Sequence, residues 1–187
     1  MKEIKHIKSI KEVHEIFGFP KPKHPLVTVL PIDERMTCFD YGEFSYLFDF
    51  YQISLKSGIV GTFGYGRNNY DFTEGTMTFI QPNQVIKVNG SMSTDGEKGW
   101  TLLFHPDLIR KSELANTIET YNYFNYEVHE ALHLSDDEKK SLTSLAQKIE
   151  QEYNQNIDRH SQEIIIANIE MILKYCCLLY TSDAADD

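Results

Sequence analysis

Short segments in which polar and apolar residues alternate, separated by turns, constrain the fold of this chain more than any other feature. The pattern runs from Ser45 to Leu103, with turn signals about every eight to twelve residues. This spacing is typical of a β-sandwich or a small β-barrel. The strand candidates are LVTVLPI (26–32), SYLFDFYQISLK (45–56), IVGTFGY (59–65), TMTFI (76–80), QVIKV (84–88) and WTLLF (100–104).

Pro106 marks a change from this pattern to helical periodicity. Ser135 and Glu138 have the spacing of a capping box, which predicts a helix over about 135–153. A second helical pattern covers about 158–176. Because the linker NQNID between them is short, we expect the two helices to be antiparallel neighbours.

The N-terminal region, residues 1–25, is predicted to hold a short helix and a connector. Ser9 and Glu12 repeat the capping-box spacing at the start of a helix over 9–17, and the connector PKPKHP is extended by its prolines. The expected fold class is therefore mainly β then α, a small β-barrel followed by a helical hairpin.

Charge and cysteine content exclude several function classes. The formal net charge of the 187 residues is −10, and we find no basic stripe or helix-turn-helix signature, so direct DNA contact is not expected. No apolar run reaches the roughly 18 residues of a membrane span, and the N-terminus lacks the apolar core of a signal peptide. With only three cysteines, two of them adjacent, a reduced and cytoplasmic setting is expected.

Catalytic and metal-binding patterns are missing from the sequence. A small β-barrel metal site needs two histidines one residue apart on a strand, a glutamate and a later histidine. Residues 61–88 have the right glycine and proline spacing but contain no histidine, and Glu74 stands alone. No GxSxG motif occurs either. We therefore predict no catalytic residue, no metal and no cofactor, and a protein that is not an enzyme.

Aromatic residues and one arginine are the candidates for binding a small molecule. Arg67 could clamp an anionic ligand through its directional donors, although a structural ion pair with Asp71 or Glu74 is the commoner role for such an arginine. Trp100 offers a face on which a ligand could stack. The predicted ligand-binding residues are Arg67, Trp100, Tyr51, Tyr65 and Tyr70.

Three blocks of the sequence resemble the N-terminal half of AraC-type transcriptional regulators. They are YGRNNYDFTEGTM (65–77), GWTLLFHPDLI (99–109) and EALHLSDDE (130–138). The resemblance implies a cupin-like β-barrel that senses a small-molecule effector over 26–105, and helices for dimerisation over 106–176. It also implies that DNA is bound only through a C-terminal domain missing from this chain. The alternative is a metal-dependent or ligand-binding cupin protein with no DNA partner.

The second long helix carries more apolar residues than one neighbour needs. One interpretation is that the extra apolar side packs on the barrel. The other is a two-fold homodimer, which would present two DNA-binding domains to two half-sites. Seven-residue repeats within the helix suit a two-helix seam. The residues predicted for that seam are Ile165, Ile166, Ile169, Ile172 and Leu173.

The last residues, CLLYTSDAADD (177–187), break the helical pattern without a stop signal. They resemble the translation of a transposase-type sequencing adapter. We therefore expect 177–187 to be an artefactual, disordered tail that can be deleted without loss of stability, and the chain to be a truncated regulator.

Overall fold

In the computed structural model of this chain, the described residues are 3–40, 44–65, 68–72, 75–87, 99–124, 132–155 and 157–183; for 59–65, 68–72 and 180–183 the description covers the backbone alone. The strands are β1 (Ile4–Ile7), β2 (Val27–Pro31), β3 (Ser45–Phe48), β4 (Tyr51–Lys56), β5 (Ile59–Tyr65), β6 (Asn68–Phe72), β7 (Thr76–Ile80), β8 (Val85–Lys87), β9 (Gly99–Phe104) and β10 (Leu132–His133). The helices are α1 (Ile10–Ile16), α2 (Glu34–Thr37), α3 (Pro106–Ile109), α4 (Leu114–Thr117), α5 (Asp136–Tyr153) and α6 (Arg159–Asp183), with 3-10 turns at Ile118–Thr120 and Asn122–Phe124.

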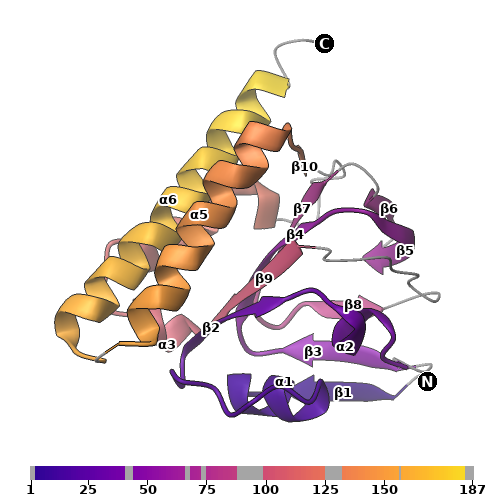
Figure 1. The fold of residues 1–187 in the computed structure, drawn as a ribbon, viewed down its shortest axis with the longest axis horizontal. Coiled ribbons are helices and arrows are strands. Elements are labelled where there is room, and N and C mark those ends of the chain that lie inside the picture. Colours follow the sequence, from indigo (N-terminus) through magenta and orange to yellow (C-terminus); the bar gives the residue numbers. More distant parts are fainter. Residues whose placement is uncertain are drawn as a thin grey trace.

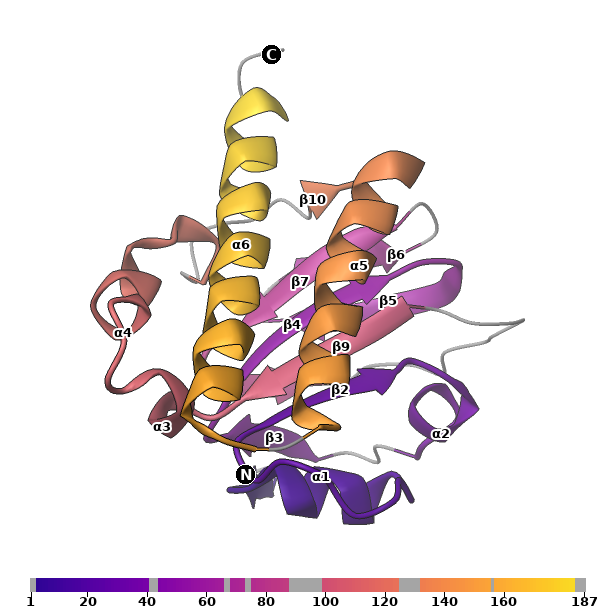
Figure 2. The same cartoon turned by 60° about the vertical axis from the view of Figure 1, so that its left-hand side comes forward.

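Three sheets and one pair of long helices make up the described part of the fold. The largest sheet is antiparallel and has five strands in the order β10-β7-β4-β9-β2, whereas β1, β3 and β8 form a second sheet and β5 pairs with β6. α5 and α6 lie side by side on one side of the five-stranded sheet, and β3, β8, β5 and β6 lie on the other (Figures 1 and 2). The expected combination of β-sheets with a helical hairpin is confirmed, but the fold is not mainly β, because helices hold more of the described residues than strands do.

The main core lies between the five-stranded sheet and the helices. Period-two alternation turns every second side chain of the sheet toward α5 and α6. The side chains on this side are apolar and aligned across strands, as where Ile53 pairs with Phe79 on one neighbour and Leu102 on the other. The buried sheet residues of this core are Val27, Val29, Ile53, Leu55, Met77, Phe79, Trp100, Leu102, Phe104 and Leu132.

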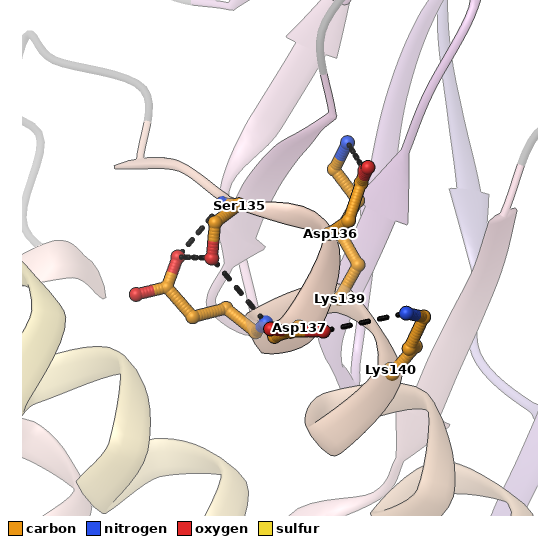
Figure 3. Close-up of polar contacts among 6 residues, drawn as sticks. Ser135, Asp136, Asp137, Lys139 and Lys140 are labelled. Carbon is orange, nitrogen blue, oxygen red and sulfur yellow. Dashed lines mark hydrogen bonds and ion pairs between the residues drawn. The ribbon is translucent and has the colours of Figure 1, made fainter.

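The start of α5 is fixed by the capping box that the sequence predicts. The Ser135 backbone N–H donates to a Glu138 carboxylate oxygen at 2.7 Å, and the Glu138 N–H donates to Ser135 Oγ at 3.4 Å (Figure 3). Figure 3 also shows ion pairs from Asp136 to Lys139 and from Asp137 to Lys140 in the first turns. Acidic residues at this end also complement the helix dipole.

The segment SYLFDFYQISLK is not one strand, contrary to the prediction. It bends at Asp49 and Phe50, so that β3 joins the three-stranded sheet and β4 the five-stranded sheet. The bend is held from two sides, because the Asp49 N–H donates to the Ile7 carbonyl and the Phe48 carbonyl accepts from Asn83. Aromatic alternation continues through the bend, which is why the pattern alone does not reveal it.

The predicted barrel and tail also need revision. Within the described residues the five-stranded sheet is open, with β10 and β2 as its edges, so no closed barrel is formed by them. The disorder predicted from 177 onward is wrong as far as Asp183, because α6 continues to that residue. Extending an existing helix costs far less than nucleating one, and Leu178 and Leu179 are good helix formers. Residues 184–187 lie outside the described ranges.

Candidate functional site

The side of the five-stranded sheet that faces away from the helices is polar at its centre. We call this side the polar face and define it by Thr28, Gln52, Ser54, Lys56, Thr76, Thr78, Thr101 and His133, which strand alternation and pairing place together. Its central row crosses three neighbouring strands, because Ser54 of β4 pairs with Thr101 of β9 and with Thr78 of β7. Ser54 and Thr101 are buried despite being polar.

Most hydroxyl groups with described contacts on the polar face have a partner. Ser54 Oγ donates to Thr101 Oγ1 at 2.7 Å, and Thr28 Oγ1 lies 3.1 Å from His14 Nε2. Thr78 differs, because its Oγ1 is buried and finds no hydrogen-bond partner among the described residues. An unsatisfied buried hydroxyl costs about 1–3 kcal/mol. A partner that offsets this cost comes from water, from a ligand or from residues outside the described ranges.

A second buried polar atom without a partner among the described residues lies in the turn that follows β7. Gln84, in the turn from β7 to β8, is 2% exposed. Its side-chain oxygen accepts from the Gln81 N–H at 3.0 Å, but its Nε2 has no partner among the described residues. The amide nitrogen is therefore a buried donor that is unsatisfied within the described residues.

Lys56 brings a cation to the polar face. It is partly buried and lies two residues beyond Ser54 on β4, so it shares that side of the sheet. Desolvation lowers the pKa of Lys56 from its ordinary 10.5 to about 8. Opposite Lys56, Gly99 has φ +110, and a side chain at this position would collide with the Leu55 carbonyl oxygen. Glycine is therefore required beside the lysine.

Apolar packing closes one end of the polar face. Leu30 and Leu103, which share this side of the sheet, belong to a second core with Ile10, Tyr46 and Phe50. The small sheets lie on this same side (Figures 1 and 2). The hydroxyl groups are thus withdrawn from solvent and sit next to an apolar wall, as in sites that bind small molecules.

Two predicted ligand-binding residues lie on the opposite side of the sheet. Trp100 is 6% exposed in the helix-facing core, and its indole Nε1 donates to Thr143 Oγ1 of α5 at 3.0 Å. Tyr51 packs between Phe104 and Phe124, with ring centroids 5.0 and 5.3 Å away. Both side chains are fixed by protein contacts, so the expected stacking role inside the β-domain does not fit their position.

The other predicted ligand-binding residues cannot be placed at the site. Arg67 lies outside the described residues. Tyr65 and Tyr70 are on β5 and β6, whose backbones pair, but their side chains lie outside the description. Their roles stay predictions.

Four of the five residues predicted for a dimer seam are covered within one chain. They are Ile165, Ile169, Ile172 and Leu173, each 0% exposed and part of the core beneath α6, while Ile166 is partly buried against the same core. A seam between two copies therefore has to use other residues. The side of α6 that is exposed carries Ile164, Met171 and Tyr175 at 44%, 45% and 45% exposure.

A hollow of about 390 Å³ between β1 and α1 is the other place where a ligand could be sought. Two of its polar side chains are already paired, because His6 contacts Asp49 and Glu12 binds Ser9 and the Lys8 N–H. The described residues contain no cluster of histidine, cysteine, aspartate or glutamate suited to a metal ion. Within the same ranges, no helix has the length and apolar character needed to cross a membrane.

Comparison with family models and with curated proteins finds no match for this chain. The chemistry of the polar face is therefore the main guide to function.

Proposed function

We propose that this chain is the ligand-sensing and dimerisation module of an AraC-type transcription regulator, whose DNA-binding function resides in sequence beyond these residues. The observation that carries the sensing part is the buried polar face with its unsatisfied Thr78 hydroxyl. The resemblance in three sequence blocks and the arrangement of β-sheets before a helical hairpin support the same function. A cupin-like β-domain is part of this proposal.

If Thr78 had a purely structural role, a different residue would be favoured at this position. If the residue only filled space, valine would serve better, because it has the same shape without the desolvated hydroxyl. Retaining the hydroxyl lowers stability and makes sense where a bound molecule uses it. Such a compromise between stability and binding is common at functional sites.

Thermal stability in the presence of a metabolite library tests the sensing function. We expect at least one compound to raise the Tm of the wild-type protein, and Thr78→Val to reduce that shift while leaving the unliganded protein at least as stable. Thr117→Val, an equivalent change at an exposed helical position, should respond like the wild type. If no compound shifts the Tm, or if Thr78→Val responds fully, the sensing function is wrong.

The dimerisation part of the proposal uses the exposed stripe of α6, formed by Ile164, Ala167, Met171 and Tyr175. Ile164 and Met171 are seven residues apart, the spacing at which a helix repeats a contact with a partner helix. An antiparallel copy that sets Ile164 against the partner's Met171 also brings Glu163 near the partner's Lys174, on the same side of the stripe. The stripe is therefore complementary to itself in apolar residues and in charge, as a two-fold interface requires.

Met171→Asp is expected to convert the dimer to folded monomers, because a charge at an exposed position disrupts the interface without entering the core. Sedimentation velocity at tens of micromolar measures the change. Ser144→Asp adds the same charge at an exposed position of α5 and should leave the dimer intact. A monomeric wild-type protein, or a dimeric Met171→Asp variant, would show that α6 does not form the interface.

A further inference from the structure

Two histidines, each followed by a proline, lie in neighbouring turns where β2 begins and β9 ends. In each turn the histidine Nδ1 accepts from the backbone N–H two residues later, His24 from Leu26 at 3.0 Å and His105 from Asp107 at 3.1 Å. The turns are joined directly, because the His105 N–H donates to the Leu26 carbonyl at 2.8 Å. The backbone at this corner of the molecule is therefore held by two imidazole acceptors.

The contact with Leu26 fixes the protonation state of His24. A backbone N–H can only donate, so the Nδ1 that it contacts carries no proton, and the neutral ring holds its hydrogen on Nε2. A hydroxyl partner could rotate to accept from a protonated ring, but a backbone amide cannot. Protonation of His24 at Nδ1 therefore removes this hydrogen bond and sets two N–H groups against each other.

The surroundings of His24 also oppose a positive charge. The side chain is 5% exposed, and desolvation by burial lowers its pKa below the ordinary 6.5. The titratable or charged groups of the elements packed at this corner are Lys21, Lys23, His14, His105, Asp107 and Tyr153. Within the described residues no carboxylate pairs with His24, because the Asp107 carboxylate contacts His105 and Arg110 instead.

His105 is in a different situation, although its turn contains the same hydrogen bond. Its side chain is 28% exposed, and an Asp107 carboxylate oxygen lies 3.6 Å from its Nδ1. When His105 is protonated, this carboxylate is a new partner for Nδ1, and water reaches the ring. The two turns therefore have one geometry but a different tolerance of charge, and His105 is a matched comparison for His24.

We propose that His24 is a pH-sensitive switch, which holds the start of β2 beside the end of β9 while it is neutral and loosens this corner when it is protonated. The corner also includes α3, whose Leu108 carbonyl accepts from Gln162 of α6 at 2.9 Å. It thus joins the N-terminal connector, the five-stranded sheet and the helical hairpin. His24 is not part of the polar face, so this switch and the proposed sensing function can fail separately.

The direction of the pH effect follows from the lowered pKa of His24. Above pH 6.5 the ring is neutral in both the native and the unfolded chain, and its hydrogen bond contributes fully. As the pH falls below 6.5, the unfolded chain binds the proton first, because the native pKa is lower. Acid therefore shifts the equilibrium toward the open or unfolded state.

His24→Asn tests the switch, because the asparagine Oδ1 can accept from the Leu26 N–H but does not titrate. Urea denaturation from pH 7.5 to 5 compares it with the wild type, and the comparison cancels other titrating groups such as His14. We expect similar stability at pH 7.5. Below pH 6.5 the unfolding equilibrium constant of the wild type should rise relative to the variant, by up to about tenfold per pH unit. His105→Asn should follow the wild-type profile.

Side-chain ¹⁵N NMR of the wild-type protein is a second measurement, which does not depend on a variant that folds. We expect the His24 ring to be neutral with its hydrogen on Nε2 at pH 7.5 and to titrate below 6.5. The Leu26 amide should lose protection from hydrogen exchange over the same range. Parallel pH profiles for His24→Asn and the wild type overturn the switch, and so does a His24 ring that carries a proton on Nδ1 at pH 7.5.

Discussion

Ile169→Ala is expected to lower the free energy of unfolding by about 2–5 kcal/mol, because Ile169 of α6 is fully buried in the main core. Removing its side chain leaves a cavity that packed neighbours fill only in part. Chemical denaturation with urea measures the change. The unfolding midpoint should fall while the slope with denaturant stays the same.

Ile164→Ala is the control for this prediction, since it makes the same substitution on the same helix at a residue that is 44% exposed. It should cost less than about 1 kcal/mol in the isolated chain, where little apolar area is lost and alanine favours helix. If Ile169→Ala left stability unchanged and only dissociated a dimer, the buried face of α6 would be the interface, as the sequence pattern suggested.

Lys56→Met is expected to raise the free energy of unfolding at pH 7 by roughly 2–3 kcal/mol, because the native state holds a lysine whose pKa is lowered to about 8. Below pH 8 the amine is protonated in both states, and the native state carries the full cost of desolvating the charge. Between about pH 8 and 10.5 only the unfolded state is protonated, so wild-type stability rises with pH. Above 10.5 the cost is gone.

Urea denaturation of both proteins from pH 7 to 10.5 measures this difference. The gap between Lys56→Met and wild type should shrink as pH rises, by up to about 1.4 kcal/mol per pH unit. Comparing the two proteins removes the contribution of other groups that titrate in this range, such as the buried tyrosines. A constant gap across the range would show that Lys56 has an ordinary pKa and is well solvated.

Local signals in the sequence predicted the helical hairpin well. The spacing of Ser135 and Glu138 located the start of α5, and Ser9 with Glu12 located α1, because a capping box depends only on residues three apart. Gly18 follows the C-cap Phe17 of α1 and has a positive φ of 69°. Strands β1, β6 and β10 were missed, since their polar residues and short length hide the alternation.

The polar face could not be predicted from the same signals. Ser54, Thr78 and Thr101 lie on three strands and are ordinary residues in sequence. Only the register of the sheet brings their side chains into one row, and register depends on long-range pairing. A usable signal does exist in hindsight, because each is a small hydroxyl residue between apolar neighbours in a strand covered on both sides.

The sequence also could not predict which side of α6 packs on the sheet. Ile164, Ile165 and Ile166 are consecutive, so a count of apolar residues cannot say which one faces the sheet. The structure resolves this, with Ile165 fully buried and Ile164 exposed. The side of the sheet on which Trp100 lies was ambiguous in the same way. Successive residues of a strand point to opposite sides, so Thr101 lies on the polar face while Trp100 faces the helices.

Calorimetric titration of the strongest library ligand into wild type, Thr78→Val and Trp100→Phe tests most directly whether the polar face is the binding site. We predict one ligand per chain, affinity that falls about 3- to 10-fold in Thr78→Val, and affinity close to wild type in Trp100→Phe. Trp100→Phe removes the hydrogen bond to Thr143 and part of the buried indole, both on the helix side of the sheet. Binding that is lost in Trp100→Phe and unchanged in Thr78→Val would contradict this, and would place the ligand between the sheet and the helices.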